Sequence, residues 1–126
     1  MVDENQMKNV LQAYIDGFNH GDAEAIIALY ADDATVEDPV GKPPMQGKPA
    51  IAKFYRNSIK TGAKLALAAP IRASQGQEAG MAFDVRLEMP QGPALIRVID
   101  VMRFDSEGRI ASMRAFWGLS DMQMGG

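Results

Sequence analysis

The segment ALIRVIDVMRF, residues 94–104, decides the fold class of this chain of 126 residues. In an extended strand its side chains alternate between two faces, of which one carries two arginines and the other is apolar except for Asp100. The segment MAFDVRLEM, residues 81–89, shows the same alternation, and a turn rich in proline and glycine at 90–93 separates the two. A third strand is expected over 110–117. The pattern predicts an antiparallel sheet in the second half of the chain.

The first half of the chain has the period of helices. Apolar residues at steps of three and four predict a helix over residues 4–19 and a second helix that Asp22 caps and that extends to Tyr30. A short strand is expected over 34–38, and a third helix between Pro49 and Gly62. Helices followed by strands predict one α+β domain over the whole chain, with three N-terminal helices packed on a curved mixed or antiparallel sheet. Such a sheet would form a conical barrel with an apolar pocket.

The amino-acid composition argues against several classes of function. Hydrophobic residues make up 47% and charged residues 23%, as in ordinary globular proteins, and the formal net charge is -3. Without a basic cluster there is no electrostatic basis for binding nucleic acid or an anionic membrane. With no cysteine and one histidine, zinc sites and hydrolytic triads have little support, so no metal or cofactor is expected. The polar first residues and the lack of long apolar runs lead us to expect a cytoplasmic protein.

Several polar side chains are expected on apolar faces. Asp100 lies among four apolar residues on its strand face, where a carboxylate without a cation takes up a proton and becomes a hydrogen-bond donor. Asp38 shares a strand face with two apolar residues and stands at the strand end, where the mouth of a cavity could hydrate it. Tyr14 lies within the apolar stripe of the first helix, and its phenol needs a partner if it is buried. Tyr30 and Tyr55 occupy similar positions on the later helices.

Each of these residues also has an ordinary structural explanation. A buried tyrosine is more often a core residue than a catalytic one, and an aspartate before proline often forms a turn. If Tyr14, Asp38 and Asp100 share one cavity, an ionised carboxylate can act as a general base while a phenol and a neutral carboxylic acid donate hydrogen bonds to one oxygen. This combination suits abstraction of a proton beside a carbonyl and its return to another carbon, which needs no cofactor.

Three segments resemble the bacterial Δ5-3-ketosteroid isomerases: AYIDGFNHGDAEAIIALYADDATVEDPVGKPP (13–44), IAKFYRNSI (51–59) and RVIDVMRFDSEGRIASMRAFWG (97–118). The most specific parts are YADDATVEDP and VIDVMRF, and the match is weaker over 62–80. The resemblance implies a conical α+β barrel of the nuclear-transport-factor-like type, usually a homodimer. It implies a steroid Δ-isomerase that converts Δ5-3-ketosteroids to conjugated Δ4-3-ketosteroids.

The resemblance also implies roles for single residues. Asp38 would be the base that carries a proton between two carbons of the steroid, and Tyr14 and the protonated Asp100 would bind the oxyanion. Tyr30 and Tyr55 would support Tyr14 through hydrogen bonds. Apolar substrate-binding residues are expected at Phe18, Phe54, Ile59, Met81, Val98, Met113, Ala115 and Trp117.

Other functions fit the same scaffold. A non-catalytic steroid or lipid carrier would need the apolar pocket but not an ionised Asp38. An enzyme similar to polyketide cyclases could use one pocket aspartate as acid or base. An epoxide hydrolase would need an Asp-Arg-Asp arrangement, and Arg97 and Arg103 fall on the strand face opposite Asp100, which counts against it.

Overall fold

The computed structural model describes residues 2–125. These residues form an α+β domain, which confirms the expected fold class. The elements follow in the order α1 (Glu4–Asn19), α2 (Ala23–Ile27), β1 (Tyr30–Glu37), β2 (Met45–Gln46), α3 (Lys48–Lys60), β3 (Lys64–Leu67), β4 (Glu78–Met89), β5 (Gly92–Phe104), β6 (Ile110–Phe116), a 3-10 turn η1 (Leu119–Asp121) and β7 (Met122–Met124).

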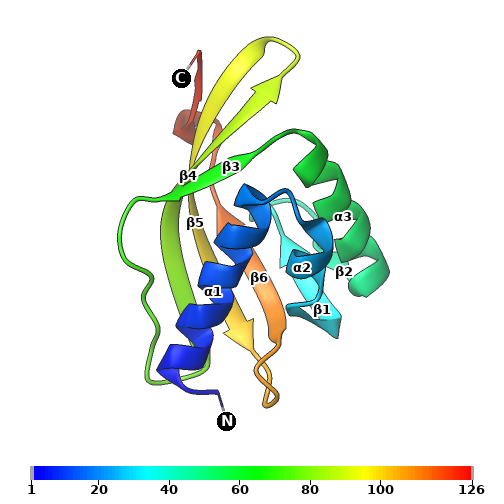
Figure 1. The fold of residues 1–126 in the computed structure, drawn as a ribbon, viewed down its shortest axis with the longest axis vertical. Coiled ribbons are helices and arrows are strands. Elements are labelled where there is room, and N and C mark those ends of the chain that lie inside the picture. The colour runs from blue at the N-terminus through cyan, green and yellow to red at the C-terminus, as the bar shows by residue number, and fades with distance from the viewer. Residues whose placement is uncertain (1, 126) are drawn as a thin grey trace.

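The strands form one mixed sheet with the order β2-β1-β6-β5-β4-β3, and β7 pairs with β5 beyond the end of β6. The predicted meander of β4, β5 and β6 is antiparallel, whereas β1 joins β6 in parallel. Figure 1 shows the three helices on one face of this sheet, with the β4–β5 hairpin and the C-terminal segment together at one end.

The first helix begins and packs as its sequence predicts. Asp3 accepts a hydrogen bond from the backbone N–H of Gln6, whose side chain accepts in return from the backbone N–H of Asp3, which is a capping box. The apolar stripe of α1 is buried against the sheet and α2. Gly17 lets α2 approach closely, because a Cβ at this position would lie 2.6 Å from Cγ1 of Ile26. Tyr14, on the same helix, is buried against the core.

The structure corrects some expected boundaries. The apolar steps predicted Tyr30 on the second helix, but α2 ends at Ile27 and Tyr30 is the first residue of β1, where it pairs with Ile110 of β6. Sheet pairing overrides the local helical pattern here. Strands β2, β3 and β7 and the 3-10 turn η1 have weak sequence signals and were not expected. The three strands are short and pair at the edges or one end of the sheet, so tertiary contacts decide their conformation.

The strand that carries Asp100 has the two faces that the sequence predicts. Val98, Asp100 and Met102 are buried on the side of the helices, while Arg97 and Ile99 are exposed on the other side.

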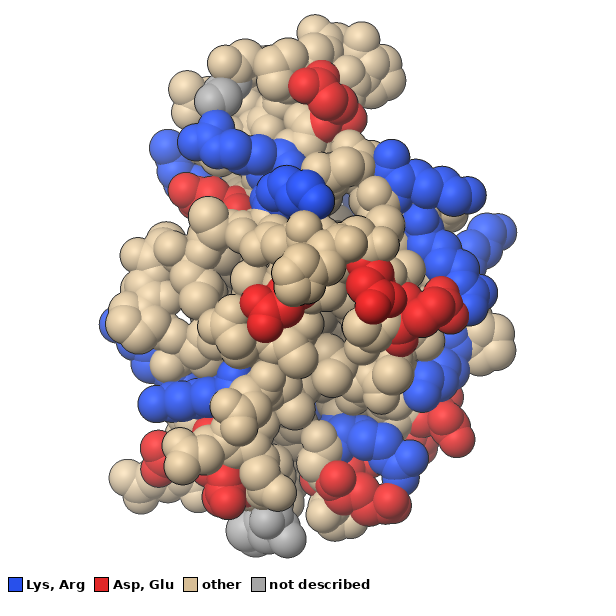
Figure 2. Space-filling view, in the orientation of Figure 1, with Lys and Arg blue, Asp and Glu red and all other residues tan. Residues whose placement is uncertain are grey.

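Figure 2 shows that acidic and basic residues intermingle on the helical face of the molecule. Among the described residues, no helix is both long and apolar enough to cross a membrane.

Candidate active site

A cavity of about 230 Å³ lies between the helices and the sheet. It can hold an organic ligand, since a single buried water needs only about 10–15 Å³ on a comparable measure. Most of its lining is aliphatic or aromatic. The polar residues at its wall are Tyr14, Asp38, Ser58, Thr61, Asp100 and Trp117. The structure therefore brings Tyr14, Asp38 and Asp100 to one apolar cavity.

Asp100 lies at the closed end of this cavity. Its relative exposure is 1%, and neither carboxylate oxygen has a hydrogen-bond partner within the described residues. Burial raises the pKa of Asp100 well above its ordinary value, and the negative charge of Asp38 raises it further. Burial therefore favours the neutral carboxylic acid form of Asp100, whose O–H has no partner among the described residues and can donate into the cavity.

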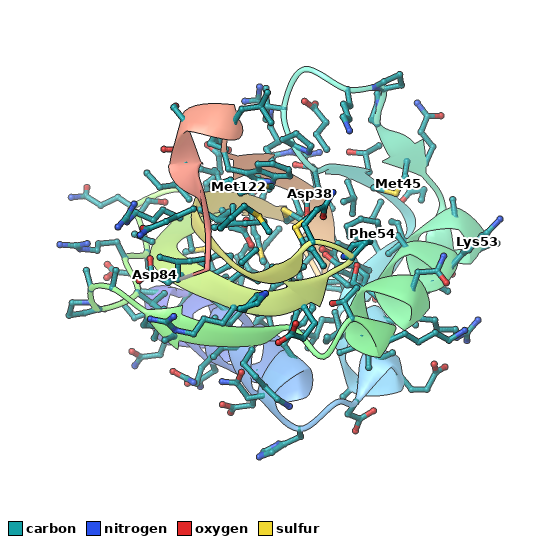
Figure 3. All side chains as sticks on the ribbon, turned by 90° about the horizontal axis from the view of Figure 1, so that it is seen from above. Asp38, Met45, Lys53, Phe54, Asp84 and Met122 are labelled. Carbon is teal, nitrogen blue, oxygen red and sulfur yellow. The ribbon has the colours of Figure 1, made fainter. Side chains whose placement is uncertain are left out.

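Asp38 occupies a wetter position just after the end of β1. It is half-buried, and the indole Nε1 of Trp117 donates a hydrogen bond of 2.8 Å to its Oδ1. Burial raises the pKa of Asp38, while the indole hydrogen bond and the positive charge of Lys42 oppose this rise. Figure 3 shows Asp38 and Phe54, which both line the cavity, near the centre of the view, whereas Lys53 points outward from α3. Of the two carboxyls in the cavity, Asp38 is the one that has partners for its charged form.

Three tyrosine hydroxyls form a buried chain. The hydroxyl of Tyr55 lies 2.9 Å from that of Tyr14 and is also hydrogen-bonded to the hydroxyl of Tyr30. The three residues come from α3, α1 and β1, and all are at most 3% exposed. If Tyr30 donates to Tyr55 and Tyr55 donates to Tyr14, the proton of Tyr14 stays free for a ligand. Only Tyr14 of the three lines the cavity.

The tyrosines remain protonated at ordinary pH. Burial raises the pKa of Tyr14 well above its normal value, and the negative charge of Asp38 raises it further, while the hydrogen bond with Tyr55 lowers it. Burial likewise raises the pKa of Tyr30 and of Tyr55. Tyr14 and Asp100 thus offer two hydroxyl donors at the closed end, which can stabilise a negative oxygen.

The structure places four of the eight expected substrate-binding residues at the cavity wall: Phe18, Phe54, Val98 and Trp117. The other four, Ile59, Met81, Met113 and Ala115, do not line it. Met81 and Ala115 are the register neighbours of Asp100 on the adjacent strands, and with Met113 they fill the core around it. On α3 the cavity contacts Ser58 rather than Ile59, a difference of one helical position.

Sequence reasoning missed eight lining residues: Ser58, Thr61, Ala63, Leu65, Phe83, Val85, Leu87 and Ile96. Some had a usable signal, because Phe83, Val85 and Leu87 share the strand face of Met81, and Ile96 shares that of Val98. Ala63 and Leu65 lie on or next to β3, within the segment where the family resemblance is weakest. Among residues 2–125, no group of three His, Cys, Asp or Glu is arranged to hold a metal ion.

Fold and cavity together define a class of protein. The chain belongs to the SnoaL-like domain family, whose model matches residues 11–113. It is 41% identical over 118 residues to a steroid Delta-isomerase of Nocardioides simplex, covering 93% of this chain and 94% of that protein. It is also 28% identical over 125 residues to the epoxide hydrolase LasB of Streptomyces lasalocidi, of which it spans 44% of the length.

The fold also matches a solved structure closely. With a TM-score of 0.90 and 29% sequence identity, the chain resembles SalBIII, an epoxide hydrolase/cyclase-like enzyme with a role in pyran ring formation in the polyether salinomycin. The match covers 97% of this chain and 98% of that one. The scaffold therefore occurs in relatives with different named activities, and the site decides between them.

Proposed function

We propose that this protein is a steroid Δ-isomerase that converts Δ5-3-ketosteroids to conjugated Δ4-3-ketosteroids. One observation carries the proposal: a single apolar cavity holds Asp38 with a partner for its charge, and Asp100 without one. The first can accept a proton and the second can donate a hydrogen bond. The 41% identity to a protein named steroid Delta-isomerase, over nearly the whole chain, supports the same reaction.

The reaction follows from these positions. Asp38 takes a proton from the carbon between the ketone and the double bond, and the electron pair of that C–H bond moves into a dienolate. Tyr14 and Asp100 donate hydrogen bonds to the dienolate oxygen, where the negative charge develops. Asp38 then returns the proton to the far carbon of the former double bond, so the double bond becomes conjugated with the ketone. Every atom of the substrate is retained, and Asp38 ends as it began.

The pKa values of the two carboxyls suit this division of work. A raised pKa makes Asp38 a stronger base than a free aspartate, while Trp117 limits the rise and keeps the carboxylate ionised. Asp100 must stay neutral to donate, and its burial favours the neutral form. A carrier of steroids or lipids would have no use for these opposed carboxyls.

Epoxide opening is the second candidate reaction, because LasB is named an epoxide hydrolase and SalBIII an epoxide hydrolase/cyclase-like enzyme. A neutral acid and an ionised base in one cavity could in principle protonate an epoxide oxygen and activate its nucleophile. Against it, Arg97 and Arg103 are exposed on the far face of β5, so the Asp-Arg-Asp arrangement is missing around Asp100.

Ultraviolet absorbance with a Δ5-3-ketosteroid tests the proposal, because the conjugated product absorbs strongly where the substrate does not. We expect rapid conversion by the wild type and a loss of at least about 10²-fold in Asp38→Asn, the lower part of the range for general base catalysis. Circular dichroism should show the same fold in both. Wild-type activity in Asp38→Asn would contradict the assignment of the base, and saturable steroid binding without turnover would favour a carrier.

We further propose that the protein forms a homodimer through the sheet face opposite the helices. Ile99 and Phe116 are register partners on this face and are 51% and 39% exposed. They border a surface hollow of about 570 Å³ that also includes Asp84 and Arg97. Charges of both signs beside an apolar centre allow a two-fold related copy to pair them reciprocally. The expected cytoplasmic location stays a prediction.

Sedimentation velocity at micromolar concentration tests the dimer. We expect a dimer for the wild type and a monomer for Ile99→Glu, which places a charge in the apolar centre of the patch. Asp33→Asn is the control and should stay dimeric, because Asp33 is exposed on β1 and does not border this hollow. A monomeric wild type would refute the dimer.

A further inference from the structure

The cavity has polar groups at two separate ends, and only one end serves the proposed reaction. Tyr14 and Asp100 form the closed end and are 3% and 1% exposed. At the open end the wall includes Ser58, which is half-buried, and Thr61, which is exposed. Neither hydroxyl has a part in moving the proton. The two ends of a bound ligand therefore meet different polar groups.

Helix α3 connects the two ends and sets their separation. Tyr55, which is hydrogen-bonded to Tyr14, marks the closed end, and Ser58 and Thr61 follow it at steps of three residues. With a helical rise of about 1.5 Å per residue, Thr61 lies about 9 Å along the axis from Tyr55. A rigid fused-ring ketone that places its oxygen at Tyr14 and fills this cavity would bring its opposite end toward Ser58 and Thr61, which line the same wall.

The hydroxyls at the open end are already committed as donors. The Oγ of Ser58 donates to the backbone carbonyl oxygen of Phe54 at 2.9 Å, and the Oγ1 of Thr61 donates to that of Ser58 at 2.6 Å. A carbonyl oxygen has no proton to give, so each hydroxyl proton must point to the backbone. What remains for a ligand are the lone pairs of the two oxygens, which can only accept.

We propose that Ser58 and Thr61 select substrates that carry a hydroxyl at the end opposite the reacting ketone. The closed end offers donors, which suit a ketone oxygen, and the open end offers acceptors, which suit a hydroxyl proton. A second ketone at the open end would face the lone pairs of Ser58 and Thr61 without a proton between them. This inference rests on the proposed isomerase function and adds the substrate class that the site prefers.

The preference should be modest, and Ser58 should contribute more of it. A neutral hydrogen bond contributes about 0.5–1.5 kcal/mol, which corresponds to about two- to tenfold in affinity. Water competes more strongly at the exposed Thr61 than at the half-buried Ser58. The selectivity should therefore appear in Kd and KM rather than in the chemical step, which takes place at the other end of the cavity.

A pair of matched steroids tests the inference. We would measure kcat and KM for Δ5-3-ketosteroids with either a hydroxyl or a ketone at position 17, and the Kd of the matching Δ4 products by calorimetry. The hydroxyl compound should bind about three- to tenfold more tightly, with similar kcat for both. In Ser58→Ala combined with Thr61→Val, this ratio should fall to near one. Thr61→Ser should keep most of it, because its hydroxyl can make the same bonds.

Asn57→Ala provides the matched control on α3. Asn57 is exposed and does not line the cavity, so its replacement should leave the ratio of the two steroids unchanged. Equal affinity of the two steroids in the wild type, or a ratio that survives Ser58→Ala with Thr61→Val, would overturn this inference alone. Absence of binding and turnover with both steroids would instead overturn the proposed isomerase function.

Discussion

Trp117 and Asp38, which are 79 positions apart in the sequence, meet at the wall of the cavity through a hydrogen bond of 2.8 Å from Nε1 to Oδ1. An indole N–H can donate only, so this contact favours the ionised form of the carboxyl. It opposes the effect of burial, which raises the pKa of Asp38. It also fixes one carboxylate oxygen and leaves the other free to accept a proton from substrate. Trp117 is thus part of the cavity wall and also holds Asp38, the proposed base, in position.

Trp117→Phe keeps an aromatic wall and removes this hydrogen bond. The pKa of Asp38 should rise further, so the acidic limb of the profile of kcat/KM against pH should move to higher pH. The loss of activity should be greatest at low pH and should shrink as the pH is raised. The profile measured with a Δ5-3-ketosteroid checks this.

Lys42→Met provides a second variant in which the pKa of Asp38 should rise, but by less than in Trp117→Phe. The positive charge of Lys42 also lowers the pKa of Asp38, but its effect is smaller than that of the Trp117 hydrogen bond. The acidic limb should move in the same direction by less. An acidic limb that stays in place in Trp117→Phe, with a lower plateau at every pH, would mean that Trp117 acts as a wall alone.

Tyr14→Phe removes one of the two donors at the closed end. We expect kcat to fall by about 10²–10³, the usual scale for one oxyanion donor. The Kd of the Δ4 product should change much less, since the apolar walls of the cavity remain. Steady-state kinetics and calorimetry on the same preparation separate these effects. A loss of only a few-fold in kcat would show that Asp100 or water takes over the role.

The sequence predicted the secondary structure correctly where the spacing of apolar residues along a segment matches the face that the segment buries in the folded protein. The alternation in 81–89 and 94–104 is strong because one face of each strand is buried against the helices. Tyr30 shows the opposite case, because its local pattern is helical while its backbone pairs with Ile110 in a parallel ladder. A partner about 80 residues away leaves no trace in the local period.

The candidate site was predictable in part for a similar reason. Asp100 stands out because a carboxyl among apolar neighbours on one strand face has few structural explanations. The contact between Trp117 and Asp38, and the direction of the hydroxyls of Ser58 and Thr61, depend on how separate elements meet. Neither the spacing of residues nor the composition determines such contacts, because they depend on the three-dimensional arrangement of the elements.

Asp100→Asn should change how stability depends on pH. The folded pKa of Asp100 is raised, while the unfolded chain ionises this group near pH 4. Its contribution to stability is therefore fully present below pH 4 and is lost as the pH rises toward the folded pKa. An asparagine has no such transition, so the variant should be more stable than the wild type at pH 8 and similar at pH 4.

Urea unfolding at both pH values measures this difference, and each unit of pKa change on folding corresponds to about 1.4 kcal/mol. The exposed Asp33→Asn corrects for the change in net charge. If Asp100→Asn and the wild type lose stability in parallel between pH 4 and pH 8, Asp100 is ionised in the folded protein.

Gly17→Ala tests the close approach of α1 and α2. Alanine is the better helix former by about 0.5–1 kcal/mol, so propensity alone predicts a gain in stability. The new Cβ would lie 2.6 Å from Cγ1 of Ile26, which must move within the core. We expect a net loss of about 1–3 kcal/mol, the usual cost of overpacking. Gly76→Ala is the control, because its nearest neighbour would be Ser74 Oγ at 3.8 Å, and thermal unfolding should show no loss there.

The chain of tyrosine hydroxyls predicts that two substitutions cost less than one. Tyr55→Phe leaves the hydroxyl of Tyr30 buried at 0% exposure without its partner, which should lower the free energy of unfolding by about 1–3 kcal/mol. Adding Tyr30→Phe removes the stranded hydroxyl and should restore part of that loss. Urea unfolding of the two single variants and the double variant gives the coupling directly. Simple additivity of the two losses would mean that the Tyr30 hydroxyl finds another partner, and that Tyr55 does not depend on it to orient toward Tyr14.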